Sequence, residues 1–504
     1  MLDINRADLV AGVAGSGTMG RGIAQVLAQC GVRTLVFDTM PGAANAAKAS
    51  IAQSLARLLE KGRVTQAEID ATLARIEIVD ALDGLAPAHI VIEAIVESLE
   101  PKRELFRALE GVVSEKCILA SNTSSLSVTA MAAACKRPAR VAGYHYFNPV
   151  PVMKIVEVVD GALTEPWVGD ALVALAKRYG HRPVRCKDTP GFIVNHAGRG
   201  FIPESLRALA EGVADFATID RILVDTAGFR IGPFGLLDLV GLDVAHGVMQ
   251  SFHAQYYGEP KYSPSYLCDP RVAAGLLGRK TGRGWYVYGK DGAAQKIPEP
   301  PVPASKAQRV WVSPDATALK ELAAKLGAQI EAGAKPSADA ICMVAPLGKD
   351  ATTTALELGI DPARTVAVDP LFGFSKRRTL MTTPVTRPEL RDAAHGLLAA
   401  DGVPVSVIRD SGGFVAQRVV AHIVNVGCEI VQQRIATPAD LDSAVMLGLG
   451  YPHGPLAMGD AVGAGRILAI LEAMHDLYQE PRYRASPWLR RRAHLGVSLL
   501  TPDS

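Results

Sequence analysis

A glycine-rich run near the start of the chain could hold the phosphates of a nucleotide. The segment Gly15-Ser16-Gly17-Thr18-Met19-Gly20 follows a short apolar run and precedes a helical pattern. In this arrangement the first glycine permits a tight turn, the second lets a pyrophosphate approach the backbone, and the third lets helix and strand pack closely. The pyrophosphate then rests on the N–H groups at the start of the helix. The run therefore predicts a dinucleotide site.

An acidic residue at a suitable spacing indicates the type of dinucleotide. Asp38 ends the run RTLVFD, 18 residues after Gly20. A carboxylate there can accept hydrogen bonds from ribose hydroxyls. No arginine follows Asp38 directly to hold a 2′-phosphate, so the pattern favours NAD over NADP. On the residues alone, an ordinary glycine-rich turn with Asp38 as a turn residue stays open as the alternative.

Polar residues follow the other strand-like runs of the same region. In an open parallel sheet, ligands bind beyond the carboxyl ends of the strands, so these residues would converge on one edge. They are Glu97 and Lys102 after HIVIEAI, Asn122, Ser124 and Ser125 after KCILA, and His145 and Asn148 after RVAGY. Each one alone could equally be a helix cap or a turn residue. Their convergence is what predicts a site.

His145 has a carboxylate within reach in the next strand-like run. Glu157 stands twelve residues later, in KIVEVV. A neutral imidazole can take the proton of an alcohol while hydride leaves the carbinol carbon, and a paired carboxylate fixes the tautomer and stabilises the imidazolium. The pair therefore indicates alcohol oxidation, with a hydrogen-bonded structural histidine as the alternative.

The elements that must position these residues predict an α/β protein. From about residue 9 to 188, β-branched runs alternate with helical patterns, which indicates a Rossmann-type parallel sheet with crossover helices. After Thr189 the period becomes helical. The predicted domains are an NAD-binding Rossmann-type domain (1–188), a helical domain (189–290), a Pro-rich linker (291–309), a degenerate Rossmann-like domain (310–407) and a second helical domain (408–504).

The second helical region repeats the first at an offset of 222 residues. Without a gap, Asp188, Gly191, Phe192, Asp220, Gly228, Gly232, Pro233, Asp238 and Gly241 match Asp410, Gly413, Phe414, Asp442, Gly450, Gly454, Pro455, Asp460 and Gly463. Such residues punctuate helices and turns, so matches in one register predict a duplicated unit.

Composition excludes several classes of protein. With 504 residues, 49% of them hydrophobic, the chain is too large for a single small module and too apolar to be disordered. The 53 basic and 51 acidic residues nearly cancel, so no overall field favours nucleic acid or an anionic membrane. Seven scattered cysteines without a CxxC pair predict reduced thiols in the cytoplasm and no metal site. No apolar run approaches the ~18 residues of a membrane span.

Five segments together resemble those of the NAD-dependent 3-hydroxyacyl-CoA dehydrogenases. They are GSGTMGRGIAQ, IVIEAIVESLEPKRELF, SNTSSL, GYHYFNPVPVMKIVEVV and TPGFIVN. The resemblance covers about residues 8–288, and GFVAQRVV and YPHGPLAMGD extend it into the repeat. The chain most resembles the long bacterial form of this family. That resemblance implies oxidation of (S)-3-hydroxyacyl-CoA to 3-oxoacyl-CoA, with 3-hydroxyadipyl-CoA of phenylacetate breakdown as the substrate.

The resemblance also implies roles for individual residues. His145 would be the catalytic base with Glu157 as its partner, and Ser124 and Asn195 would hydrogen-bond the substrate. Gly15, Gly17, Thr18, Met19, Gly20, Asp38, Glu97, Lys102 and Asn148 would serve NAD. Lys61, with Arg57 and Arg63 nearby, offers a cation to the phosphates of coenzyme A, although a charged helix surface looks the same.

The repeat departs from the family's pattern where chemistry would be done. Gln417 stands at the position of Asn195, the His145 segment has become VAVDPLF, and no GxGxxG loop is present. In the first copy, His196 stands where the family usually has arginine. We predict that the second copy is structural. Helical domains of this family commonly pair to form the dimer, so the resemblance implies that the second helical region packs on the first within one chain. The predicted assembly is a homodimer or a pseudo-dimeric monomer. The alternatives for the whole chain are a 3-hydroxybutyryl-CoA or general β-oxidation dehydrogenase, a Rossmann dehydrogenase of sugar acids, and an NAD-binding scaffold without catalysis.

Overall fold

An eight-stranded sheet, in the order β3-β2-β1-β4-β5-β6-β7-β8, forms the centre of the first of two structural units. The computed structural model describes residues 2–503, and Met1 and Ser504, the outer bounds of the first and last predicted domains, lie outside them. The first unit holds residues up to 196 together with 433–449, and the second holds 197–432 and 450 onward. The five-domain division stays a prediction.

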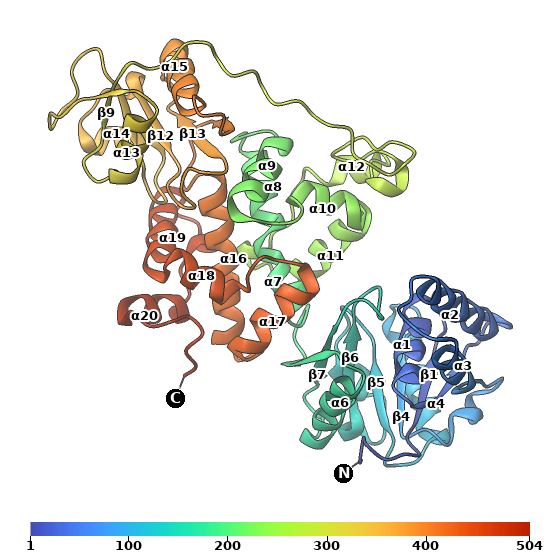
Figure 1. The fold of residues 1–504 in the computed structure, drawn as a ribbon. Coiled ribbons are helices and arrows are strands. Elements are labelled where there is room, and N and C mark those ends of the chain that lie inside the picture. Colours follow the sequence, from blue (N-terminus) through green and yellow to red (C-terminus); the bar gives the residue numbers. More distant parts are fainter. Residues whose placement is uncertain (1, 504) are drawn as a thin grey trace. The chain divides into compact units, whose positions relative to one another are not determined.

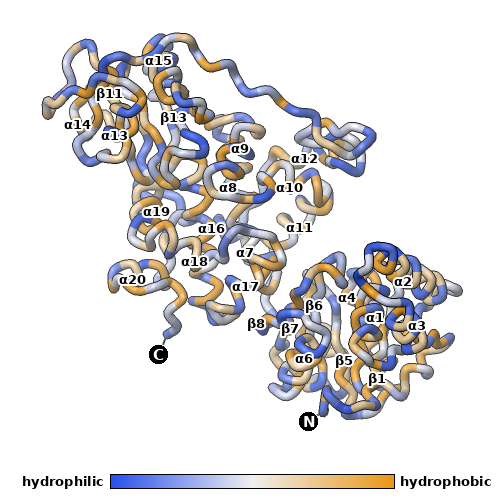
Figure 2. The backbone as a smooth tube through the Cα atoms, viewed as in Figure 1, coloured by the Kyte–Doolittle hydropathy of each residue, from blue (hydrophilic) through white to orange (hydrophobic). Residues whose placement is uncertain are grey.

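Strands and helices alternate along the first unit (Figure 1). The strands are β1 (Val10–Ala14), β2 (Arg33–Phe37), β3 (Ile76–Ile78), β4 (Ile90–Glu93), β5 (Ile118–Ser121), β6 (Val141–Tyr146), β7 (Ile155–Asp160) and β8 (Arg182–Lys187). The helices are α1 (Thr18–Gln29), α2 (Ala43–Glu60), α3 (Gln66–Ala74), α4 (Leu99–Val112), α5 (Val128–Ala132), α6 (Pro166–Arg178) and α7 (Val194–Ala197). Strand β1 is apolar and buried throughout (Figure 2), and β4 is buried throughout and apolar up to Glu93, as expected of a sheet covered on both faces.

One strand pair departs from the predicted parallel sheet. Strands β6 and β7 run antiparallel, whereas the other neighbouring strands of this sheet pair in parallel. The register of the antiparallel pair sets His145 directly opposite Glu157. Directly opposed residues have neighbouring side chains on the same face of a sheet. The exception to the parallel sheet therefore creates the predicted pair.

The second unit contains a smaller sheet and most of the helical regions. Its sheet has the order β10-β9-β11-β12-β13-β14. The strands are β9 (Arg309–Val312), β10 (Gln329–Ile330), β11 (Ile341–Val344), β12 (Thr365–Val368), β13 (Arg378–Thr382) and β14 (Val405–Ile408). Helices α13 (Thr317–Lys325), α14 (Ala351–Leu358) and α15 (Pro388–Leu398) belong to this sheet. Its apolar core is separate from that of the first sheet.

The helices of the second unit come from both copies of the repeat. Those of the first copy are α8 (Ile202–Ala210), α9 (Phe216–Ala227), α10 (Pro233–Val240), α11 (Leu242–Gln255) and α12 (Asp269–Ala273). Those of the second copy are α16 (Val415–Gln432), α18 (Pro455–Val462), α19 (Ala464–Tyr478) and α20 (Pro487–Leu495). The Pro-rich segment between the copies is extended (Figure 1) and is held by Glu299, which accepts hydrogen bonds from Arg377.

Each copy contributes a segment to the sheet of the other copy. The amide of Lys187, at the end of β8, donates to the carbonyl of Ile435, and helix α17 (Pro438–Leu449) packs on β7 and β8. The amide of Arg409, just after β14, donates in the same way to the carbonyl of Val213. Under the offset of 222 residues these two bonds are the same bond with the copies exchanged. This reciprocity is that of an isologous dimer contact, made within one chain.

Helix α16 forms the centre of the contact between the helical regions. It is buried along nearly its whole length and contacts α8, α9 and the short turn Gly198–Gly200. A Cβ on Gly200 would lie 2.7 Å from the Cα of Ile423, so only glycine permits this approach of the two backbones. The second helical region therefore covers the first, as predicted.

A buried ion pair joins the two copies at this contact. Arg418 and Glu204 are both fully buried, and the guanidinium donates to the carboxylate at 2.7 Å. Arg482 lies 3.5 Å from the other oxygen of Glu204. At the 222-residue offset, the counterparts of Arg418 and Glu204 are His196 and Val426. The pair therefore exists once, and a first copy joined to another first copy could not form it.

Ending the chain after Lys296 should produce a fragment that self-associates and unfolds at a lower temperature than the full chain. The fragment lacks α16, which leaves the apolar surface under that helix uncovered, and it lacks Arg418 and Arg482, the cations of Glu204. Where self-association buries Glu204 again, the unpaired charge costs about 3–5 kcal/mol. Light scattering and thermal unfolding measure both effects. Glu204→Gln in the fragment, which removes the charge, should recover part of the lost stability. A monomeric fragment as stable as the full chain would show that the second copy covers nothing.

Candidate active site

The glycine-rich loop joins β1 to α1 with the geometry that a dinucleotide requires. Gly15 has φ +99°, a conformation that favours glycine, and a Cβ there would lie 2.6 Å from the carbonyl oxygen of Ala94. A Cβ on Gly20 would lie 1.8 Å from the carbonyl oxygen of Gly15, whereas one on Gly17 would meet open space. The first and third glycines thus close the turn, and the second leaves room beside the backbone for a phosphate.

Asp38 is tied to the same loop from the end of β2. One of its carboxylate oxygens accepts hydrogen bonds from the amide and the hydroxyl of Ser16, both at 2.7 Å, and the other accepts from the amide of Met40 at 2.9 Å. Partial burial opposes ionisation, but these hydrogen bonds outweigh it and lower the pKa of Asp38. A permanent carboxylate beside the loop fits a ribose with free hydroxyls and repels a 2′-phosphate.

The start of α1 is open to an anion. Its N-cap, Gly17, contributes no side-chain hydrogen bond to the first turn, which begins with Thr18 and Met19. The N–H groups of an uncapped first turn carry partial positive charge. Together with the open space at Gly17 and the carboxylate of Asp38, this loop fits NAD.

His145 and Glu157 form a buried pair between β6 and β7. Nδ1 of His145 lies 2.6 Å from Oε2 of Glu157, and the carboxylate is fully buried. The other oxygen, Oε1, accepts hydrogen bonds from the amides of Ile193 and Val194, each at 2.9 Å. Because the carboxylate can only accept from Nδ1, that nitrogen carries the proton and Nε2 is left as the basic atom.

Ser124 and Asn195 lie together at the same edge of the first sheet. The side-chain amide of Asn195, on α7, donates to the carbonyl of Ser124 at 3.4 Å. Ser124 follows β5, and the side chain of Asn122 beside it accepts from the amide of Tyr146 at 2.9 Å. The loop after β5 is thereby attached to the strand that carries His145, so the structure brings all four predicted catalytic residues into one unit.

Glu97 organises the loop that contains Ser124. Its carboxylate accepts from the hydroxyls of Thr123, Ser124 and Ser125 and from the amides of Ser124 and Ser125. Burial opposes ionisation of Glu97, but the charge of Lys102 and these hydrogen bonds lower its pKa. Lys102 is itself buried between Glu93, at 2.5 Å, and Glu97, at 3.3 Å. Any influence of Lys102 on a cofactor therefore passes through Glu97.

Two predicted binding residues stand apart from this network. Asn148 is exposed just after β6, and Lys61 is exposed at the end of α2.

One residue of the site, Glu93, was not predicted from the sequence. Glu93, at the end of β4, accepts from the hydroxyl of Ser121 at 2.6 Å and from Lys102. An acidic residue inside the apolar run HIVIEAI was the available signal.

A dinucleotide loop and a buried His–Glu pair, both attached to the carboxyl ends of one largely parallel sheet, define an NAD-dependent dehydrogenase of the Rossmann type. The family model of the 3-hydroxyacyl-CoA dehydrogenase NAD-binding domain matches residues 10–189, and that of the C-terminal domain matches both 191–288 and 413–498. The chain belongs to this family, and NAD is its cofactor. The double match confirms the predicted repeat, and the predicted fold class and family are confirmed with it.

Similar proteins include both full-length and half-length relatives. A 3-hydroxyadipyl-CoA dehydrogenase of Escherichia coli K12 is 37% identical over 483 residues, which cover 96% of this chain and 97% of that protein. The crystal structure of a 3-hydroxybutyryl-CoA dehydrogenase from Escherichia coli K12 has a TM-score of 0.85 at 36% identity and covers 97% of this chain and 99% of its own. That of an (S)-3-hydroxybutyryl-CoA dehydrogenase from Ralstonia eutropha has a TM-score of 0.54 at 41% identity, covering 56% of this chain and 99% of its own.

Three further observations bear on other predicted partners. The seven cysteines are all free. Among residues 2–503, no group of histidine, cysteine, aspartate or glutamate side chains could hold a metal ion. Within the same residues, no helix has the length and apolar character that a membrane span requires.

Replacing Asp38 should change the choice of cofactor. In the wild type, NADH should be used far better than NADPH, because the Asp38 carboxylate accepts from the ribose and repels a 2′-phosphate. Asp38→Ala should narrow this preference chiefly by weakening NADH, which steady-state KM values for both cofactors measure. The exposed Asp70→Ala, on α3, is the matched control. Equal use of NADH and NADPH by the wild type would remove Asp38 from the site.

Proposed function

We propose that the chain oxidises (S)-3-hydroxyacyl-CoA to 3-oxoacyl-CoA through His145. The observation that carries this proposal is the buried hydrogen bond between His145 and Glu157 at the sheet edge that also holds the dinucleotide loop. When bound, NAD supplies the hydride acceptor. We also propose that NAD is bound by the glycine loop and the residues near it, which are Thr18, Met19, Asp38, Glu97, Lys102 and Asn148. Lys102 would act by positioning Glu97.

The protein's own residues handle the proton and the substrate oxygen. Nε2 of His145 takes the proton of the 3-hydroxyl group, and the Glu157 carboxylate stabilises the imidazolium that forms. The side chains of Ser124 and Asn195 donate hydrogen bonds to the oxygen as it becomes a carbonyl. Glu97 holds the Ser124 loop in place through its hydrogen bonds to the turn.

His145→Ala should lower turnover by roughly 100- to 10,000-fold and leave NADH binding nearly unchanged, because a general base acts in the transition state. Glu157→Gln should be almost as harmful, since it removes the charge that stabilises the imidazolium. Turnover and NADH titration together measure the split. His494→Ala, on an exposed side chain at the end of α20, serves as the control. Wild-type turnover in either active-site variant would refute the mechanism.

We further propose 3-hydroxyadipyl-CoA, from phenylacetate breakdown, as the substrate. The support is that a protein similar over nearly the whole of both chains is named 3-hydroxyadipyl-CoA dehydrogenase, whereas proteins named 3-hydroxybutyryl-CoA dehydrogenase include half-length chains. The alternative, 3-hydroxybutyryl-CoA, is favoured by the full-length structure with that name.

The substrate proposal predicts that kcat/KM is highest for 3-hydroxyadipyl-CoA. 3-Hydroxyhexanoyl-CoA is the matched comparison because it has the same chain length and no terminal carboxylate, and 3-hydroxybutyryl-CoA tests the alternative. A terminal carboxylate recognised by a charge-assisted hydrogen bond gives about 1.5–3 kcal/mol, or on the order of ten- to a hundredfold in kcat/KM. Equal values for the six-carbon substrates would refute the dicarboxylate, and no NADH formation with any of them would leave an NAD-binding scaffold.

We also propose a single chain as the working unit, a pseudo-dimeric monomer in the cytoplasm. Support for the single chain comes from the reciprocal contacts Lys187–Ile435 and Arg409–Val213, and the light scattering of the full chain described above tests it. The seven free cysteines support a reducing compartment.

We propose that Lys61, which is exposed and without an ion pair among residues 2–503, contacts the phosphates of coenzyme A. Lys61→Ala should then raise the KM for the acyl-CoA substrate.

A further inference from the structure

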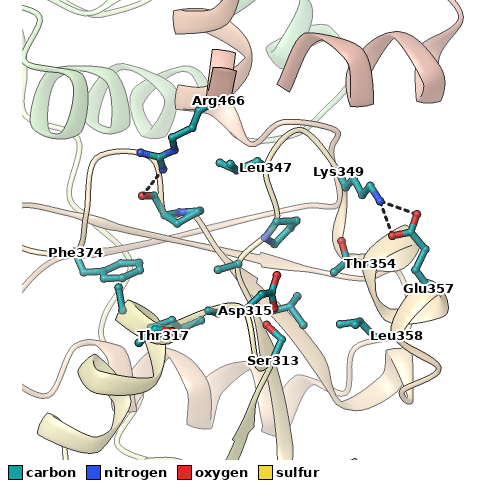
Figure 3. Close-up of a pocket in the computed structure, with 17 residues that line it drawn as sticks. Ser313, Asp315, Thr317, Leu347, Lys349, Thr354, Glu357, Leu358, Phe374 and Arg466 are labelled. Atoms are coloured by element: carbon teal, nitrogen blue, oxygen red, sulfur yellow. Dashed lines mark hydrogen bonds and ion pairs between the residues drawn. The ribbon is translucent and has the colours of Figure 1, made fainter. Parts of the chain in front are cut away.

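A cavity lies at the carboxyl edge of the second sheet. It has a volume of about 520 Å³ and is lined by the loops after β9 and β11, by Pro370 and Phe374 after β12, and by Arg466 from the first turn of α19 (Figure 3). From β9 the chain passes through α13 to β10 on one side, while β11 lies on the other side. The strand order thus reverses between β9 and β11, and such switch points are where open α/β sheets bind ligands.

The loop after β9 does not suit a dinucleotide. It runs Ser313-Pro314-Asp315-Ala316-Thr317, where the first copy has its glycines. Pro314 has no N–H to donate, and Asp315 places a carboxylate where the pyrophosphate would lie. The residues that replaced the catalytic ones are bonded to each other, since Gln417 donates to Asp369 at 2.9 Å and to the carbonyl of Pro346 at 3.1 Å. The side chains at the former reaction site of this copy therefore satisfy one another, whereas the neighbouring cavity is open.

The charges around the cavity select a ligand with one negative charge. Arg466 donates to the carbonyl of Pro370 at 3.3 Å and forms no ion pair with any carboxylate in residues 2–503. The other lining cation, Lys349, is paired with Glu357 at 2.6 Å (Figure 3). At the 222-residue offset, the counterpart of Arg466 is Val244, so the second copy has a cation where the first has an apolar side chain. With Asp315 and Glu357 also in the lining, a dianionic phosphate is disfavoured.

Most of the uncharged lining is apolar, and its hydroxyl groups are those of Ser313, Thr317 and Thr354. Leu347 follows β11, and Pro370 and Phe374 follow β12, so that apolar side chains face the cavity from two neighbouring strand ends. Small-molecule sites in proteins are of this size and are mostly apolar, with a few polar groups that fix orientation. A guanidinium pairs with a carboxylate through two parallel hydrogen bonds.

We propose that this cavity binds a small molecule with one negative charge and a largely apolar body, such as an organic carboxylate. Its charge would meet Arg466, and its body would lie against Leu347, Pro370 and Phe374. The second copy would then have exchanged the first copy's chemistry for a binding site of its own.

Calorimetric titration of the full chain, saturated with NAD⁺ and coenzyme A to fill the active site, tests the proposal. The probe is 1-anilinonaphthalene-8-sulfonate, an apolar monoanion. One probe should bind per chain, and hexanoate should displace it. Arg466→Gln should weaken binding at least tenfold, and Leu347→Trp, which fills the cavity, should remove it. Lys376→Gln, on an exposed lysine of the loop that carries Phe374 but outside the cavity lining, should bind like the wild type.

Three results would overturn the proposal. The first is an Arg466→Gln variant that binds the probe as the wild type does. The second is displacement of the probe by adenosine monophosphate but not by hexanoate, which would indicate a nucleotide site. The third is no binding by the wild type. Unchanged dehydrogenase turnover and thermal unfolding in all variants show that they are folded, because none of these residues belongs to the active site.

Discussion

The carboxylate of Glu157 is the constraint on which the active site depends. It is fully buried, and a buried charge is tolerated only where hydrogen bonds replace water. One oxygen meets His145, and the other meets the amides of Ile193 and Val194. Strand β7 must therefore keep its antiparallel register with β6, and the chain leaving β8 must turn back to present two amides. That turn places Phe192 at φ +48°, in the left-handed region. The second copy keeps the same turn, with Phe414 at φ +42°, although Thr379 now occupies the strand position beside Asp369 that corresponds to Glu157.

The sequence predicted the parts of the site that depend on local spacing. The glycine loop, Asp38 and the polar residues after each strand follow from strand–turn–helix order, and the His–Glu pair from two adjacent strand-like runs. The carboxylate network did not follow. The sequence places Glu97 and Lys102 at the sheet edge, but it does not show that Glu97 accepts hydrogen bonds from the turn after β5 or that Lys102 is buried against Glu93. Side-chain partners across strands depend on tertiary packing, which no single-sequence pattern contains.

Asp188 and its counterpart Asp410, retained in both copies, each hold the start of a helix. Asp188 accepts hydrogen bonds from the amides of Val128 and Thr129, at the start of α5. Asp410 accepts from the amides of Ala351 and Thr352, at the start of α14. A carboxylate at this place stabilises the first turn of a helix. Duplication thus preserved the residues that hold the framework while the residues at the reaction site were free to change. This is why the residues that match between the two copies are mostly Gly, Pro and Asp of the framework and not residues of the reaction site.

The contribution of α17 to the first sheet has a consequence for the order in which the chain can fold during synthesis. Strand β8 ends at Lys187, and the amide of Lys187 donates to the carbonyl of Ile435, which is made much later. A ribosome adding about 5–20 residues per second reaches that partner on the order of 10–50 seconds after β8 is made. Until then the outer edge of the first sheet is unpaired, and an exposed edge is a place where another strand can add. The newly made first half therefore stays open to wrong partners until nearly the last helices leave the ribosome.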